Sequence, residues 1–197
     1  LFLKFNTGPS GHGSPAAAGI ALALKRSGAG EVKVFIFEGE GGLTPGATHE
    51  TANSAWGLAL DNLYYVVDWN DFGIDAHPYS DVVWGSPKDW FESHGWRVYG
   101  TEKGENWNQI SRTLLQMVTG DNPEKVPSMT WFKSRKGRGY LVYDYASHGK
   151  PHPPNSENFW KLRKEFAECY GAEFTNTDGE LPNNPDAVKQ EFQANID

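Results

Sequence analysis

The stretch VKVFIFEGEGGLTPGATHE, residues 32–50, decides the fold. Its first six residues form an almost continuous apolar run of β-branched and aromatic side chains, which predicts a strand buried on both faces. A glycine-rich loop follows at residues 38–46, and we expect a helix from about Ala47 to Leu60. The next apolar run, residues 63–68, predicts a second strand. This order of elements indicates two parallel strands joined by a right-handed crossover.

The same alternation extends in both directions from this unit. Upstream, residues 14–25 predict a helix with Ser14 as its N-cap and Pro15 in its first turn. Downstream, we expect helices at 87–94, 107–118 and 157–170, and strands at 96–99 and 128–132. The fold class predicted is α/β, a three-layer sandwich with a mostly parallel sheet covered on both faces. We expect one domain over residues 1–175 and a linker or tail over 176–197.

Composition excludes several classes of function. Eighteen basic and 25 acidic residues leave a formal charge of −7, which argues against nucleic acid as a partner. The short basic cluster at residues 133–138 is expected to be a solvated loop. No apolar run approaches the roughly 18 residues needed to span a bilayer, so we expect no membrane partner. The single cysteine, Cys169, fits a reducing compartment, and we expect a cytoplasmic protein.

The loop at residues 38–46 has the chemistry of a metal-dependent diphosphate site. Gly39, Gly41 and Gly42 lack a Cβ and therefore let a phosphate approach the backbone closely. The helix that follows directs its N-terminus, which favours anions, at the same place. Glu40 and Asn70 follow two neighbouring strands, and their side chains offer the oxygen ligands that Mg²⁺ or Ca²⁺ prefers. Because ligands of parallel sheets bind beyond the carboxyl ends of the strands, we expect these groups to lie together.

The glycine, acid, glycine triplet at residues 39–41, followed thirty residues later by Asn70, resembles the diphosphate-binding motif of thiamine diphosphate enzymes. The resemblance is closest to the transketolases and covers roughly residues 7–170. The segments that carry it, in chain order, are TGPSGHG at 7–13, the loop 39–46 with His49 and Glu50, residues 61–70, FESHGW at 91–96 and ASHG at 146–149.

The resemblance implies a thiamine diphosphate-binding fold and specific roles for individual residues. The metal ion would be held by Glu40, Asn70 and the backbone carbonyl of Phe72. Ile74 would pack near the thiazolium ring. The residues that the resemblance places on the cofactor are Gly8, Gly39, Glu40, Gly41, Asn70, Ile74 and His148. Two histidines are candidates for catalysis, His12 in the glycine-rich loop and His148 in the ASHG segment; for His12 the alternative is a role in stabilising the loop.

Three departures separate this sequence from the transketolase pattern. Glu40 stands where the family has an aspartate, and its extra methylene changes the reach of the carboxylate. Pro45 replaces an acidic residue that contributes to contacts between subunits, and it can equally serve as a helix start. The family's substrate-binding histidines and its cofactor-activating glutamate belong to regions that we expect outside this chain, the latter in a pyrimidine-binding domain.

These features imply the diphosphate- and metal-binding part of a transketolase-like enzyme that transfers two-carbon ketol units between sugar phosphates. The expected partners are a sugar phosphate and a pyrimidine-binding domain or subunit, in a dimer or hetero-oligomer. A phosphoketolase or a deoxyxylulose-phosphate synthase is an alternative with the same cofactor. A non-catalytic module that kept the fold is a further alternative, favoured by Glu40 and Pro45.

Overall fold

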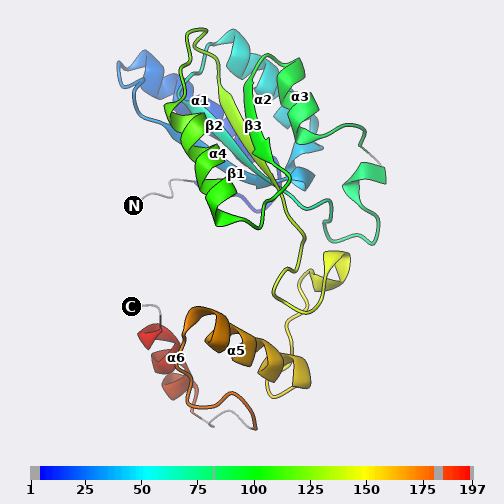
Figure 1. The fold of residues 1–197 in the computed structure, drawn as a ribbon. Helices are drawn as coiled ribbons and strands as arrows, with labels where there is room; N and C mark the ends of the chain where they lie inside the picture. Colours follow the sequence, from blue (N-terminus) through cyan, green and yellow to red (C-terminus); the bar gives the residue numbers. More distant parts are fainter. Residues whose placement is uncertain (1–4, 82, 180–183, 196–197) are drawn as a thin grey trace. The chain divides into compact units, whose positions relative to one another are not determined.

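The computed structural model describes residues 5–81, 83–179 and 184–195 (Figure 1). The chain separates into two compact units, Leu1–Lys136 and Gly137–Asp197. The first unit holds the sheet and the second is helical. Among the described residues, no helix is both long and apolar enough to cross a membrane.

The first unit is built on a parallel sheet in the order β1-β2-β4-β3. The predicted parallel arrangement is confirmed, because every neighbouring pair of these strands runs in the same direction. Register places Gly39 beside Asp68 and Trp69 beside Lys133, so the strand ends line up along one edge. The strands are β1 (Val34–Gly39), β2 (Leu63–Trp69), β3 (Arg97–Thr101) and β4 (Ser128–Lys133).

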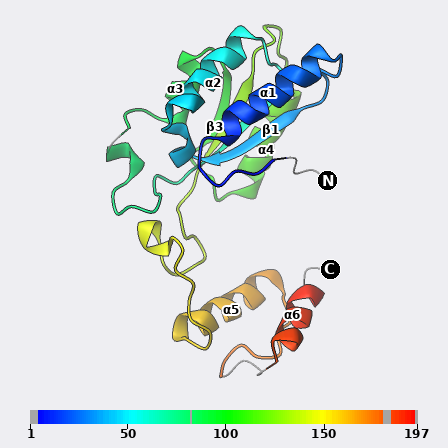
Figure 2. The same ribbon diagram turned by 180° about the vertical axis from the view of Figure 1, so that it is seen from behind.

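Helices cover both faces of this sheet. Figures 1 and 2 show α1, α2 and α3 on one face and α4 on the other. Their bounds are α1 (Gly13–Arg26), α2 (Gly46–Gly57), α3 (Pro87–Ser93) and α4 (Trp107–Thr119). Two short 3-10 helices, η1 (Glu40–Leu43) and η2 (Tyr79–Asp81), follow the ends of β1 and β2. The predicted three-layer α/β architecture is therefore confirmed.

Strand β2 lies in the centre of the core, and its side chains alternate between the two faces. Leu63, Tyr65 and Val67 are buried against α1, α2 and α3, in one cluster with Ala21 and Phe91. The alternate residues of β2, Tyr64 and Val66, pack with Met117 of α4 on the opposite face. Burial from both sides explains the unbroken apolar run at 63–67.

Strand β1 differs from the prediction. It was expected to be buried on both faces, but the side chains of Phe35 and Phe37 are 40% and 75% exposed. The reason is position: β1 is one of the two edge strands of the described sheet, and α4 packs against the strands on the far side, β3 and β4. A continuous apolar run therefore does not distinguish a central strand from an edge strand.

The start of α1 also differs from the prediction. His12, not Ser14, is the N-cap residue, and no side chain caps the helix. Ser14 lies inside the first turn, is fully buried, and its Oγ is 2.7 Å from the hydroxyl of Tyr65. This serine therefore joins α1 to the centre of the sheet.

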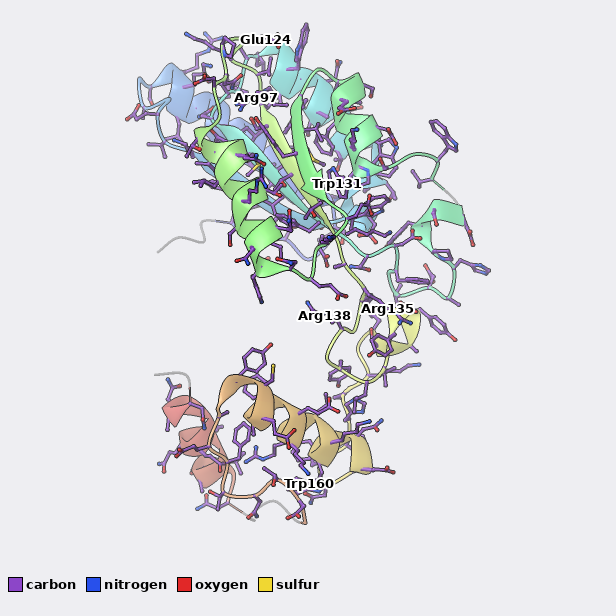
Figure 3. All side chains as sticks on the ribbon, in the orientation of Figure 1. Arg97, Glu124, Trp131, Arg135, Arg138 and Trp160 are labelled. Carbon is purple, nitrogen blue, oxygen red and sulfur yellow. The ribbon has the colours of Figure 1, made fainter. Side chains whose placement is uncertain are left out.

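The second unit contains η3 (Asp144–Ser147), α5 (Glu157–Tyr170) and α6 (Pro185–Ala194). Helix α5, which carries Trp160 (Figure 3), has the predicted bounds: Ser156 caps its start and Gly171, with a φ of 68°, follows its end. Helix α6 lies within the segment expected to be a linker or tail. Arg163 forms an ion pair with Glu191 that joins the two helices. The domain boundary at residue 175 stays a prediction.

Candidate functional site

Glu40 and Asn70 lie together where the neighbouring strands β1 and β2 end. Glu40 opens η1 directly after β1, and Asn70 directly follows β2. The Oε2 atom of Glu40 accepts a hydrogen bond from the backbone N–H of Asn70 at 3.2 Å. The structure thus joins two of the residues predicted as metal ligands, thirty positions apart in the sequence.

The carboxyl group of Glu40 is buried, with 2% of the residue exposed. Its Oε1 atom has no hydrogen-bond partner, and no cation among the described residues forms an ion pair with it. Burial raises the pKa of Glu40, although hydrogen bonds from backbone groups, that of Asn70 included, act in the opposite direction. A buried carboxylate with a free lone pair is strongly stabilised by a neighbouring cation.

The side chain of Asn70 is oriented by its neighbours. Its Oδ1 atom accepts a hydrogen bond from the backbone N–H of Phe72 at 3.1 Å. Its Nδ2 atom donates to Oδ2 of Asp68 at 3.0 Å, and Oδ1 of Asp68 accepts a further hydrogen bond from the hydroxyl of Ser134. The amide oxygen therefore faces the turn that contains Phe72, with one lone pair left over.

The backbone carbonyl of Phe72 already faces a positive charge. The ammonium group of Lys136 donates to this carbonyl at 3.2 Å and to the carbonyl of Gly73 at 2.7 Å. The expectation of a solvated loop at residues 133–138 is wrong for Lys136. It is also wrong for Lys133, whose ammonium lies 4.0 Å from the ring centre of Trp69. The basic cluster thus begins within the site rather than in solvent.

The glycine-rich segment before α1 packs onto the loop after β1. The backbone N–H of Gly11 donates to Oε2 of Glu38 at 2.8 Å. Gly11 has a φ of +83°, and a Cβ there would lie 2.8 Å from the carbonyl oxygen of Gly42. No other residue type fits this position. Gly8 and His12 are exposed, and a Cβ at Gly8 would meet no atom within 4 Å, so this part of the segment leaves open space.

The structure does not test the roles of three other predicted site residues. The side chain of Ile74 is 69% exposed in the loop after Phe72. His148 belongs to the second unit, where it follows η3 and its backbone N–H donates to the carbonyl of Tyr145 at 3.2 Å. The roles of Ile74, His148 and His12 stay predictions.

The donor set fits a hard divalent cation. It consists of the free carboxylate oxygen of Glu40, the amide oxygen of Asn70 and the carbonyl oxygen of Phe72. No group of three or more His, Cys, Asp or Glu residues that could hold a metal exists in the part of the chain that the structure describes. A cation held here therefore needs oxygens from water or from the ligand's phosphates to complete its shell.

The sequence analysis missed several residues of this edge: Glu38, Asp68, Tyr79, Ser134 and Lys136. Four of them lie at or just past the end of β1, β2 or β4, and that position was the signal available. Tyr79 lies nine residues beyond Asn70 on η2, and nothing local in the sequence brings it back to the strand ends. In Figure 3, Arg97 marks the start of β3, at the amino end of the sheet, and Trp131 lies in the second half of β4, nearer to the carboxyl end.

Comparison with known proteins identifies the family of this chain. Residues 3–167 match the family model described as the transketolase thiamine diphosphate binding domain. One subunit of the apulose-4-phosphate transketolase from Actinobacillus succinogenes is 30% identical over 137 residues, which are 70% of this chain and 48% of that protein. Transketolase 2 from Vibrio vulnificus is 31% identical over 180 residues, 86% of this chain and 26% of that protein.

Solved structures show the same fold. The transketolase from Campylobacter jejuni superposes with a TM-score of 0.70 at 24% identity, covering 96% of this chain and 29% of that one. A transketolase variant from Pichia stipitis gives a TM-score of 0.71 at 18% identity, covering 96% and 28%. The chain thus spans about half the length of the apulose-4-phosphate transketolase relative, and less of the others. On the family match, the chain belongs to the transketolase thiamine diphosphate-binding domain family.

Proposed function

We propose that this chain binds the diphosphate and the metal ion of thiamine diphosphate in a transketolase-like enzyme that transfers two-carbon ketol units between sugar phosphates. The observation that carries the proposal is Glu40: a carboxylate that is 2% exposed, with one oxygen unpartnered, beside Asn70 at the carboxyl edge of a parallel sheet. A protein gains nothing in stability from such a group, whereas a bound cation compensates for its burial.

Each residue has a distinct task in this proposal. Glu40, Asn70 and the carbonyl of Phe72 hold Mg²⁺ or Ca²⁺, and Gly39 and Gly41 expose backbone to the diphosphate. Lys136, already within 3.2 Å of the Phe72 carbonyl, adds positive charge beside the proposed metal ligands. Bound thiamine diphosphate supplies the carbon nucleophile of ketol transfer, and the chain's own contribution is to position it.

The remaining parts of the active site belong to partners. A pyrimidine-binding domain or subunit supplies the group that activates the cofactor, and a sugar phosphate is the substrate. Two of the relatives are named as single subunits of an apulose-4-phosphate transketolase, which supports an assembly in which two polypeptides share the work. We therefore propose a dimer or hetero-oligomer, with His12 and His148 facing the cofactor or the substrate.

Isothermal titration calorimetry of the chain with thiamine diphosphate in the presence of Mg²⁺, alone and with a pyrimidine-domain partner, tests this function. Binding that requires Mg²⁺ supports it. If neither preparation binds the cofactor, the proposal is wrong.

The non-catalytic alternative rests on the departures at Glu40 and Pro45. The Asn70→Ala variant separates it from the proposal, because it removes one metal ligand and leaves Glu40 in place. If the affinities for metal and cofactor do not change, the chain is a module that kept the fold without the chemistry. A phosphoketolase or a deoxyxylulose-phosphate synthase would share the cofactor site, and assays with the different sugar phosphates distinguish them.

A further inference from the structure

Tyr79 of η2 lies between two glycines at the edge of the proposed site. A Cβ built on Gly41 or on Gly73 would lie under 3.0 Å from the hydroxyl oxygen of Tyr79. Real side chains cannot come that close. Both glycines are therefore required for the phenol to occupy this place, and one of them, Gly41, belongs to the diphosphate-binding triplet.

The position of Tyr79 is held by Asp71, the residue that directly follows Asn70. The backbone N–H of Tyr79 donates to the carbonyl of Asp71 at 2.9 Å. The carboxylate of Asp71 accepts from the backbone N–H of Ser80 at 2.9 Å and from its hydroxyl at 2.7 Å. Asp71 has a φ of 71°, a conformation that turns the chain sharply after β2. The loop is thus folded back onto the strand ends by a residue adjacent to a proposed metal ligand.

The hydroxyl of Tyr79 is free to bind a ligand. It forms no hydrogen bond with any residue that the structure describes, although the side chain is only partly exposed. A phenol keeps its proton at neutral pH and donates well to phosphate oxygens. The neighbouring carbonyl of Gly73 is already engaged, since Lys136 donates to it.

We propose that Tyr79 is a binding residue for the diphosphate: its hydroxyl, placed over Gly41 and Gly73, donates a hydrogen bond to a phosphate oxygen of the ligand. This inference rests on the function proposed above. It adds to that function a side-chain contact from the loop after β2, on an element that the diphosphate-binding motif does not include.

The test compares Tyr79→Phe with Tyr99→Phe in the full chain. The first change removes the hydroxyl and keeps the ring between the glycines. The second removes a hydroxyl that accepts from Arg97, on the α4 side of β3, and serves as the matched control. Affinities are measured by calorimetry for thiamine diphosphate with Mg²⁺ and for inorganic diphosphate with Mg²⁺, and melting temperatures verify that both variants are folded. Ser80→Ala, which weakens the Asp71 anchor but keeps the phenol, provides a second perturbation of the loop.

We expect Tyr79→Phe to lower the affinity for both ligands about ten- to a hundredfold, because it removes a hydrogen bond to a charged group. Tyr99→Phe should have the affinities of the wild type. Ser80→Ala should lower both affinities by a smaller factor than Tyr79→Phe does. If Tyr79→Phe binds both ligands like the wild type, the role of Tyr79 is overturned and the proposed function stands. If only thiamine diphosphate binding weakens, the contact is not to the diphosphate and the inference is likewise wrong. If the wild type binds neither ligand, the proposed function itself fails.

Discussion

Charged side chains are partnered differently at the two ends of the parallel strands. We call the end at which the strands begin the amino edge, and the end at which they finish the carboxyl edge. At the amino edge, Lys25 forms an ion pair with Asp61 at 2.6 Å and also donates to the carbonyl of Ala59. At the carboxyl edge, Glu40 is more deeply buried than either of those side chains, yet one of its oxygens has no partner. Loops of the same chain connect the elements at both edges, so the presence of a loop does not by itself explain the difference in partners.

This difference separates polar groups that stabilise the fold from polar groups that remain able to bind a ligand. Asn62 and Arg97 reinforce the amino edge: Asn62 donates to the carbonyl of Ala21 at 3.1 Å, and Arg97 donates to that of Gly120 at 3.0 Å. At the carboxyl edge, Glu40, Asn70 and Tyr79 each keep an unused donor or acceptor. The amino edge also has a buried atom without a partner, Oδ1 of Asn62, but that amide carries no charge. Among the described residues, the unpartnered buried atom that belongs to a carboxylate lies at the carboxyl edge, and a buried unpaired carboxylate is typical of a binding site.

The largest effect is expected from Glu40→Ala. The change removes the only carboxylate of the proposed donor set, so Mg²⁺-dependent affinity for thiamine diphosphate should fall by at least about a hundredfold. Calorimetry with and without Mg²⁺ measures it. Glu40→Gln, which keeps the size of the side chain, should lose the metal dependence equally, while its melting temperature in EDTA rises because a buried charge is gone. Retained metal dependence in both variants would remove Glu40 from the site.

A smaller effect is expected from Asn70→Ala. The amide is one of three oxygen donors, and it also orders the backbone of Phe72. Cofactor affinity in Mg²⁺ should fall by about ten- to a hundredfold, with the melting temperature nearly unchanged. Equilibrium dialysis with thiamine diphosphate checks the affinity. A loss of stability comparable to the loss of binding would mean that Asn70 is structural.

A substitution at the amino edge should lower stability and leave cofactor affinity unchanged. Lys25→Met removes the ion pair with Asp61 and the hydrogen bond to Ala59, which should cost about 1 kcal/mol of unfolding free energy and leave cofactor affinity unchanged. Urea denaturation and calorimetry give the two values. If cofactor affinity changes with stability, the two edges are coupled and the contrast between them fails.

The smallest effect concerns pH and the core between the two edges. Burial raises the pKa of Tyr65 above its ordinary value of 10.0, although the hydrogen bond with Ser14 acts the other way. The unfolded chain therefore loses this proton first, and the stability contributed below pH 10 is lost as the pH rises above that value. Tyr65→Phe cannot titrate, so the stability gap between wild type and variant should narrow from pH 8 to pH 11 in denaturant titrations. A constant gap would show that Tyr65 does not resist ionisation.

The sequence predicted what depends on local pattern. The apolar run of β2 specifies that strand directly, and the bounds predicted for α5 are those of the structure. Glu40 and Asn70 are candidate ligands because both follow predicted strands. Strand β1 shows the limit of this reasoning: its apolar run reads like β2, but its edge position leaves Phe37 mostly exposed. Which strand lies at an edge is set by the tertiary arrangement and not by the run itself.

The rest of the site depends on long-range packing that no local pattern encodes. Lys136 lies 64 residues from Phe72 in the chain, and its basic neighbours favoured a solvated loop. Tyr79 reaches Gly41 only because Asp71 turns the chain after β2 and anchors Ser80. The burial of Ser14 against Tyr65 also depends on long-range packing. A serine at the start of a predicted helix is expected to cap it, but here its hydroxyl pairs with a side chain of the sheet instead.

Anomalous diffraction from crystals grown with Mn²⁺ and thiamine diphosphate tests the central claim most directly. Mn²⁺ replaces Mg²⁺ in oxygen sites and scatters anomalously. The predicted result is an anomalous peak within coordination distance of Oε1 of Glu40, Oδ1 of Asn70, the carbonyl oxygen of Phe72 and phosphate oxygens of the cofactor. Bound cofactor with the peak elsewhere, or with Glu40 still unpartnered, would contradict it.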